Sequence, residues 1–222
     1  MKITLICSCG LLIEQDGQKL LLDGLTDCLP PYEPTSPEDQ ESILLGRAPF
    51  DGLTAVACTH LHPDHWSPTL VARLRRRNPE VAVLEPEPGE FSVGAFTLTF
   101  FPIPHVPVPP RFAIEQNFAV RITAGEKTVY AAGDCASMVP PHEAALCGRR
   151  ADAAFWNGQM LSFAPTRAFL SRAAARNFIY HIPVDPKDVS GIRRKCERNL
   201  ARFREELQSV TLLESYPTVI EL

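Results

Sequence analysis

Short apolar runs separated by turn residues recur along the whole chain. An apolar run of about four to eight residues between turn signals is typical of a buried β-strand, and two such runs around Asp16-Gly17 or Ala124-Gly125 indicate a hairpin. The N-terminal apolar run is too short for a secretory signal and is expected to be the first strand. The pattern predicts further strands at 11–14, 19–23, 53–59, 81–86, 96–104, 118–123, 127–131, 151–156, 177–183 and 218–222.

Helical spacing replaces the strand pattern in other segments. Residues 67–77 begin with the capping pair Ser67-Pro68 and end in three arginines, as expected of a helix. The proline-rich segment 29–50 is expected to be a surface excursion with one helical turn near 37–45. Two further helices are predicted, at 165–176 and after Asp185-Pro186, the second with an apolar stripe of Ile192, Cys196, Leu200, Phe203 and Leu207. Because strands and helices alternate in both halves, we expect one α/β domain over residues 1–222.

The composition limits the classes of partner. The chain of 222 residues is 45% hydrophobic and 22% charged, with a net charge of −4. This balance gives no support to a nucleic-acid or anionic-membrane partner, and no run of about 18 apolar residues predicts a membrane span. The seven cysteines form no C-x-x-C pair, so we expect free thiols in a reducing cytoplasm. Cys7 and Cys9 are not expected to bind metal, because no second pair completes a structural zinc set.

Half of the six histidines lie in one stretch, CTHLHPDHWSP, at residues 58–68. Side chains that alternate along an extended stretch point the same way, so His60, His62 and Asp64 can converge, while His65 turns toward a neighbouring site. Imidazole and carboxylate groups are good ligands for zinc and similar ions. Without an ion, the clustered rings would lose hydration and repel one another when protonated. The stretch therefore predicts a metal site, rather than a solvated loop, between a buried strand and a helix.

The segment THLHPDH resembles the signature loop T-H-x-H-x-D-H of the metallo-β-lactamase fold superfamily. Four other segments resemble motifs of that family in the same order: LLLDG at Asp23, FPIPHVP at His105, VYAAGDC at Asp134 and FIYHIP at His181. The resemblance implies a four-layer αβ/βα sandwich with two mixed sheets between helices. Gly24 follows Asp23 where the family usually has proline, and Cys135 follows Asp134 where a small hydroxylated residue is common. Both departures concern the choice of subfamily and remove no metal ligand. The spacing is most similar to the lactonase-like and ribonuclease-Z-like branches.

The same resemblance implies a pair of divalent metal ions, with zinc expected and manganese or iron as alternatives. It assigns one ion to His60, His62 and His105, and the other to Asp64, His65 and His181. It places Asp134 between them, gives Asp64 and Asp134 catalytic roles, and places Asp23 behind the ligands to orient a histidine or the loop. Such a pair shares a bridging hydroxide that acts as the nucleophile and also polarises the bond to be broken.

The expected function is hydrolysis of an ester-type bond in a small substrate: a lactone, a thioester or a phosphodiester. One alternative is a ribonuclease-Z-like nuclease, although the acidic net charge disfavours a nucleic-acid substrate. Another is a non-hydrolytic di-iron redox protein, and a third is a member that keeps the fold without activity. The oligomeric state, a homo-oligomer included, is left open by the sequence.

Other polar residues receive a structural interpretation. His142 is expected at the surface and Arg111 in a solvated loop, although Arg111 could meet an anionic substrate group. Trp156 and Asn157 could line the pocket, but packing or a turn explains them equally well. The prolines of 102–110 are expected to stiffen the loop that holds His105. The basic residues of the last helix are expected to form its solvated face: Arg193, Arg194, Lys195, Arg198, Arg202 and Arg204.

Overall fold

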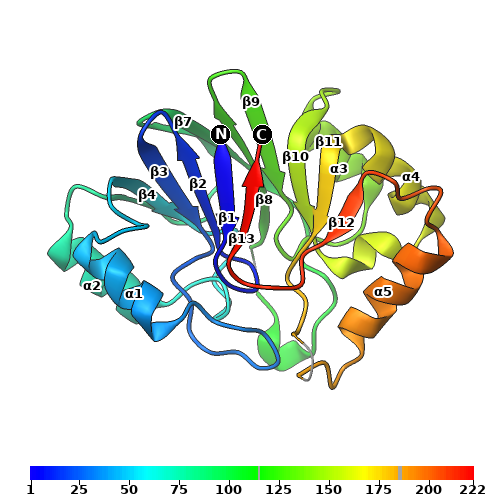
Figure 1. Cartoon of the computed structure of the whole chain (residues 1–222), viewed down its shortest axis with the longest axis horizontal. Coiled ribbons are helices and arrows are strands. Elements are labelled where there is room, and N and C mark those ends of the chain that lie inside the picture. The colour runs from blue at the N-terminus through cyan, green and yellow to red at the C-terminus, as the bar shows by residue number, and fades with distance from the viewer. Residues whose placement is uncertain (115, 185–186) are drawn as a thin grey trace.

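Two β-sheets face each other and carry helices on their outer sides (Figure 1). This computed structural model describes residues 1–114, 116–184 and 187–222. The first sheet contains, in spatial order, β13 (Thr218–Glu221), β1 (Lys2–Leu5), β2 (Leu11–Gln15), β3 (Gln18–Leu22), β4 (Leu53–Ala57) and β5 (Ala82–Leu84). Its first four strands are antiparallel neighbours, whereas β3, β4 and β5 run parallel. The sheet is therefore mixed.

The second sheet is mixed as well. It contains, in spatial order, β12 (Val210–Leu212), β11 (Ala174–Ile179), β10 (Ala151–Trp156), β9 (Lys127–Ala131), β8 (Phe118–Ala124), β7 (Phe96–Pro102) and β6 (Gly89–Val93). The strands β9 to β12 are parallel, and β6 to β9 are antiparallel neighbours. Since β7 and β9 flank the antiparallel β8, their carboxyl ends lie at the same edge.

The helices form the two outer layers (Figure 1). The helices α1 (Pro37–Leu45) and α2 (Pro68–Arg77) cover the first sheet, and α3 (Val139–Leu146), α4 (Ala164–Ala173) and α5 (Ile192–Arg202) cover the second. Short 3₁₀ turns occur at Pro110–Phe112 and Gly158–Leu161. Among the residues that the structure describes, no helix has the length and apolar character that crossing a membrane requires. The predicted four-layer α/β sandwich is confirmed.

Both faces of the central strands are buried, which explains their near-continuous apolar runs, whereas the edge strands β6, β12 and β13 are partly exposed. In β2, Leu11 and Ile13 pack into the core between the sheets, whereas Leu12 packs into the core beneath α1 and α2. In β8, Val120 faces the core between the sheets, and its neighbour Ala119 faces the core beneath α3 to α5. This period of two places three apolar cores across the four layers.

The structure corrects several predicted elements. The helix α1 has nine residues, not one turn, because Ser36 caps it and Pro37 is tolerated in its first turn. The predicted helix 165–176 ends at Ala173, since β11 begins directly at Ala174 and pairs with β10 and β12. The segment 139–146 is a helix although Pro140-Pro141 suggested a loop, because prolines fit the first helical turn. The strands β6 and β12 were not predicted from the sequence at all.

The last helix is shorter than its apolar stripe. The helix α5 ends at Arg202, so Phe203 and Leu207 lie beyond it, although both still join the core beneath the helices. The predicted cap at Asp185-Pro186 lies outside the described residues. Arg193 pairs with Glu197 and Glu214, so part of the basic face is neutralised by acidic neighbours.

Candidate metal centre

The predicted ligands and the orienting Asp23 all follow the carboxyl ends of strands. Asp23 follows β3, the 60–65 loop follows β4, and the remaining three follow β7, β9 and β11, namely His105, Asp134 and His181. The two sheets are tied together at this edge, because the backbone N–H of Phe118 donates to the Thr59 carbonyl at 3.1 Å. The fold thus brings residues from the whole length of the chain to one place.

Among the residues that the structure describes, three groups of side chains have ligand atoms within 4.8 Å of one another. One group contains His60, His62 and His105, a second contains His60, His65 and Asp134, and a third contains Cys9, His65 and His181. The first group has the composition that the sequence predicts. Cys9 in the third group was not expected, because its sequence spacing to Cys7 carried no sign of the distant histidines.

Each histidine of the first group is held by one ring nitrogen, which leaves the other facing the group. His62 Nε2 donates to the Phe112 carbonyl at 2.6 Å, and His105 Nδ1 donates to the Val106 carbonyl at 2.6 Å. His60 Nδ1 lies 3.0 Å from the Thr59 hydroxyl. His62 therefore offers Nδ1, and the other two rings offer Nε2, as lone-pair donors. Neutral imidazoles oriented by a partner on the far nitrogen are the form in which histidine binds metals.

Asp23 fixes the loop from behind. Its Oδ1 accepts from the Thr59 backbone N–H at 2.7 Å, and its Oδ2 accepts from the Thr59 hydroxyl at 2.9 Å. The same Oδ2 lies 3.1 Å from His65 Nδ1, so that ring is turned with Nε2 toward the site. Asp23 is fully buried and adopts a positive φ of 52°. Asp23 thus contacts both the loop backbone at Thr59 and the His65 ring, and its orienting role stays a prediction.

Asp134 has one carboxylate oxygen between rings of different groups. Its Oδ2 lies 3.5 Å from both His105 Nε2 and His181 Nε2, and 4.0 Å from His65 Nε2. Asp64 contacts one ring of the cluster only: its Oδ2 is 3.4 Å from His181 Nε2, and Asp64 belongs to none of the three groups of mutually close ligand atoms. The oxygen of Asp134 is therefore the best placed carboxylate atom to contact two cations.

Burial and charge shift the ionisation of the cluster. Burial lowers the pKa of His60 well below its ordinary value, so this ring stays neutral. Burial opposes ionisation of Asp134, but His181 and His105 outweigh it and hold the pKa of that carboxyl well below its usual range. Burial would also lower the pKa of His181, yet Asp134 and Asp64 raise it to about 10. Without a cation, the site thus combines two ionised carboxylates, a neutral His60 ring and a His181 ring that keeps its proton at neutral pH.

The donor set fits metal ions. Five buried polar atoms have no hydrogen-bond partner and belong to the cluster: Asp64 Oδ1, His65 Nε2, His105 Nε2, and both ring nitrogens of His181. A buried polar atom left without a partner costs about 1–3 kcal/mol. A cation would satisfy several of these atoms together, since nitrogen and oxygen donors are those that zinc and iron accept.

A cavity of about 300 Å³ opens onto the cluster, with His62, Asp64, His105 and Asp134 among its lining residues. Its other walls are mostly apolar and include Leu29, Pro30, Val106, Val108, Phe112 and Ile192. The ring of Tyr32 also lines the cavity and stacks on His181 with 4.0 Å between ring centroids. No lysine or arginine is among the described residues that line it. Arg111 is exposed, with its guanidinium over the Phe112 ring, as expected of a loop arginine.

Asn157 supports the segment that carries Asp134. Its Nδ2 donates to the carbonyls of Gly133 and Cys135, at 3.2 and 2.8 Å, and its Oδ1 accepts from the Gln159 backbone N–H at 3.1 Å. The neighbouring Trp156 is buried in the core and donates to Asn177 at 2.9 Å. Asn157 therefore fixes the backbone on both sides of Asp134, whereas Trp156 is a packing residue.

His142 is fully buried, which corrects its predicted place at the surface. It lies on α3, the helix that the sequence pattern did not reveal, and this helix turns it inward. Tyr130 donates its hydroxyl proton to His142 Nδ1 at 2.7 Å, and Nε2 donates to the Ala136 carbonyl at 3.1 Å. Burial lowers the pKa of His142 from 6.5 to about 4. His142 is a neutral structural residue outside the metal cluster.

The lowered pKa of His142 predicts a loss of stability in mild acid. The unfolded chain binds the imidazole proton below about pH 6.5 and the folded chain only below about pH 4, so stability falls as the pH drops through this window. From pH 7 to pH 5 the loss from this group is about 2 kcal/mol. The free energy of unfolding in urea should be measured for metal-free wild type and His142→Gln at pH 7 and pH 5. The stability advantage of the wild type over the variant should shrink by about 2 kcal/mol from pH 7 to pH 5. A difference that does not change with pH would contradict the assignment.

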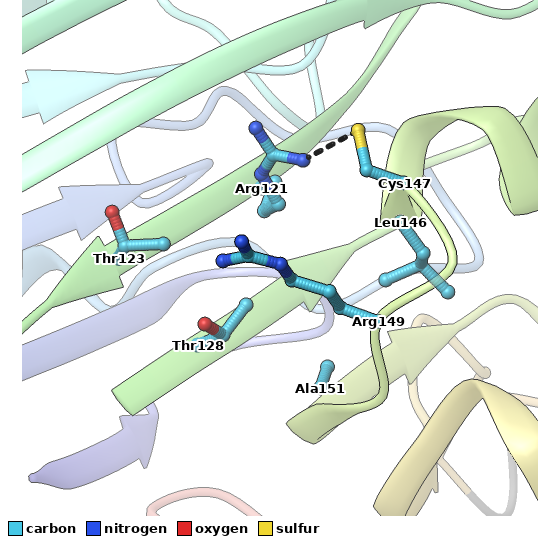
Figure 2. Close-up of a pocket in the computed structure, with 7 residues that line it drawn as sticks. All are labelled: Arg121, Thr123, Thr128, Leu146, Cys147, Arg149 and Ala151. Atoms are coloured by element: carbon cyan, nitrogen blue, oxygen red, sulfur yellow. Dashed lines mark hydrogen bonds between the residues drawn. The ribbon is translucent and has the colours of Figure 1, made fainter. Parts of the chain in front are cut away.

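A separate pocket of about 350 Å³ lies beside α3 and the β8–β9 hairpin (Figure 2). Two guanidinium groups line it, those of Arg121 and Arg149. Arg121 donates to the Ala145 carbonyl at 3.0 Å and to Cys147 Sγ at 3.1 Å, and thereby ties the last turn of α3 to β8. This arginine has a structural role at the end of a helix, and the pocket shares no lining residue with the cavity at the histidines.

Comparisons with known proteins give the family and the fold of the chain. The model of the beta-lactamase superfamily domain matches residues 2–153, a range that contains every predicted ligand except His181. A possible metal-dependent hydrolase from Veillonella parvula has a TM-score of 0.72 at 16% identity, covering 100% of this chain and 99% of that one. An isothiocyanate hydrolase from Delia radicum gut bacteria has a TM-score of 0.67 at 17% identity and the same coverage.

A protein with different chemistry shares the fold. The di-iron β-hydroxylase CmlA from Streptomyces venezuelae has a TM-score of 0.64 at 14% identity, covering 100% of this chain but 54% of that one. No curated protein sequence matches the chain significantly. At these identities the solved structures establish a shared fold.

Proposed function

Because this chain belongs to the beta-lactamase superfamily, as its motifs predicted, we propose that it is a metal-dependent hydrolase with a binuclear centre. We further propose that residues 1–222 act as one domain, a view supported by similar structures that cover the whole chain. The observation that carries the proposal is the set of five buried nitrogen and oxygen atoms without partners, beside a cavity that two of their residues, Asp64 and His105, line.

One metal position would be held by His60, His62 and His105, and the other by His65, His181 and Asp64. Asp134 Oδ2 would contact both. Divalent cations at such a site make water nucleophilic at neutral pH and polarise the bond that breaks. The ion expected is zinc, since its usual donors are imidazole and carboxylate, but manganese and iron accept the same donors.

The protein residues around the cations would orient the ligands and accept a proton. Asp64 Oδ1 is buried, lacks a partner and belongs to a residue that lines the cavity. Burial opposes ionisation of Asp64, but His181 outweighs it and lowers the pKa of the carboxyl, which is therefore ionised at neutral pH. It is thus suited to take the proton of an attacking water. The apolar walls exclude bulk water, which strengthens each of these electrostatic contacts.

The cavity favours a small and mostly apolar substrate. Its volume of about 300 Å³ lies at the lower end for small-molecule sites. A phosphodiester would bring negative charge to a cavity without a lining lysine or arginine among the described residues. We therefore favour a lactone or thioester over a phosphodiester, and a small molecule over RNA.

Two alternatives keep the same metal centre. A nuclease should bind RNA, with affinity that falls steeply as salt is added. A di-iron protein, as CmlA is, should absorb visible light as purified. We favour the hydrolase because the walls of this cavity are mostly apolar, whereas a nuclease needs cationic groups for phosphate contacts. Lys195 lines an adjoining pocket of about 180 Å³ with Asp134 and His181, and a single lysine provides few phosphate contacts.

A substrate panel tests the proposed reaction. The purified protein should hydrolyse members of a lactone and thioester series, and turnover should cease with a chelator and return with Zn²⁺. Bis-aryl phosphodiesters and single-stranded RNA serve as the contrasting substrates. Turnover that survives complete metal removal would contradict the metal-dependent reaction, and preferred cleavage of RNA would contradict the choice of substrate.

A further inference from the structure

Cys9 lies beneath the second metal position. It follows β1, its side chain is fully buried, and its Sγ belongs with His65 and His181 to a group whose ligand atoms lie within 4.8 Å of one another. The turn that carries it is tied to the final histidine, since the backbone N–H of His181 donates to the Ser8 carbonyl at 2.8 Å. The position of the sulfur is therefore fixed by the same contacts that place His181.

The two rings beside Cys9 have unused donor atoms. His65 Nε2 and both ring nitrogens of His181 are buried and lack hydrogen-bond partners. His65 cannot turn away, because Asp23 holds its Nδ1 at 3.1 Å. A single thiol cannot satisfy two imidazoles at once. One cation, in contrast, would bind the sulfur and one nitrogen from each ring.

Asp64 is the residue that the family resemblance assigns to this position, but its placement is less favourable. Its Oδ2 approaches only His181 Nε2 within ion-pair distance, at 3.4 Å, and Asp64 is absent from all three groups of mutually close ligand atoms. Its backbone carbonyl, however, lies 3.0 Å from Cys9 Sγ. The sulfur thus lies directly under the histidine-rich loop, on the inner side of the second position.

We propose that the Cys9 thiolate is a ligand of the second metal ion, together with His65, His181 and Asp134. This inference rests on the proposed binuclear centre and gives its two positions different chemistry. One position has nitrogen and oxygen donors, and the other has a sulfur. Thiolate ligands favour zinc over manganese, so the second position would select zinc. Asp64 is then free to accept the proton in hydrolysis. On binding, the thiol loses its proton to solvent and its contact with the Asp64 carbonyl.

The competing interpretation gives Cys9 only a structural role, as a hydrogen-bond donor to that carbonyl. Serine separates the two interpretations, because its hydroxyl keeps the donor and removes the sulfur. Cys7→Ser is the matched control. Cys7 is equally buried and two residues away, but its Sγ accepts from the Gly10 backbone N–H at 3.2 Å and from the Thr35 hydroxyl at 3.4 Å, and it belongs to none of the three groups.

X-ray absorption at the zinc edge tests the inference without any substrate. The wild-type protein loaded with Zn²⁺ should show a sulfur neighbour at about 2.3 Å in addition to nitrogen and oxygen neighbours at about 2.0–2.2 Å. Cys9→Ser should lose the sulfur neighbour and bind one of its two zinc ions at least about 10-fold more weakly. Cys7→Ser should keep both the sulfur neighbour and the affinity. Replacement of zinc by Co²⁺ should give a sulfur-to-metal charge-transfer band that only Cys9→Ser abolishes.

The outcomes separate this inference from the proposed centre. Wild-type protein with two zinc ions and only nitrogen and oxygen neighbours would overturn the role of Cys9 and leave the binuclear centre in place. Protein that binds no zinc would overturn both. The spectrum of the wild type decides the point even if Cys9→Ser does not fold.

Discussion

Replacing Asp134 by alanine is expected to remove most of the bound metal and to lower turnover by roughly a thousandfold or more. Its Oδ2 lies within 4.0 Å of the Nε2 atoms of His65, His105 and His181. Loss of a residue that only supports a metal ligand already costs about 10–100-fold in affinity or activity. A carboxylate that contacts two cations also screens their mutual repulsion, so its loss should cost more.

Metal content and turnover of Asp134→Ala should be measured on the same preparation. Asp152→Asn is a matched control, because Asp152 also lies in the second sheet and accepts from Lys127 and Thr128 far from the histidines. The control should keep its metal and its turnover. If Asp134→Ala retained both metal ions at full activity, the bridging assignment would be wrong.

Removal of the metals is expected to destabilise the whole fold. The apoprotein keeps five buried polar atoms of the cluster without partners, and their ligation stabilises only the folded chain. At free metal about 1,000 times the dissociation constant, each ion adds about 4 kcal/mol, so two ions raise the Tm of a chain of this size by about 20 °C. Calorimetry before and after chelation measures this shift.

Readdition of Zn²⁺ should restore the Tm. A variant that lacks one ligand of the first metal position should show a smaller change in Tm on chelation. His105→Ala is suited to this comparison, because its ring belongs only to the first group. A Tm that does not respond to chelator or to Zn²⁺ would show that the unpartnered atoms are not metal ligands.

Much of the fold could be predicted from local patterns because both faces of the central strands are buried; the more exposed edge strands β6 and β12 were missed. Apolar runs such as 53–59 have no other interpretation once the helices are assigned, and strand ends place polar residues at one edge. The helix α3 escaped prediction because Pro140-Pro141 suggested a loop, and the pattern does not distinguish a first helical turn from a break. The burial of His142 was missed for the same reason, since it depends on that helix.

Most of the candidate site could be predicted because its residues lie in short motifs at strand ends. His60, His62 and His65 are close in sequence, and motifs after the other strands supplied the rest. Cys9 could not be found in this way. Its proximity to His65 and His181 depends on a long-range backbone hydrogen bond between Ser8 and His181, and no short motif encodes that contact.

The metal content of the protein as purified, determined by elemental analysis against an amino-acid-based protein concentration, tests the central claim most directly. The account predicts about two metal ions per chain, chiefly zinc, which a chelator removes and which return on incubation with Zn²⁺. A chain that binds no divalent ion before or after incubation would contradict it, because the side chains gathered around Asp134 would then have a structural role alone.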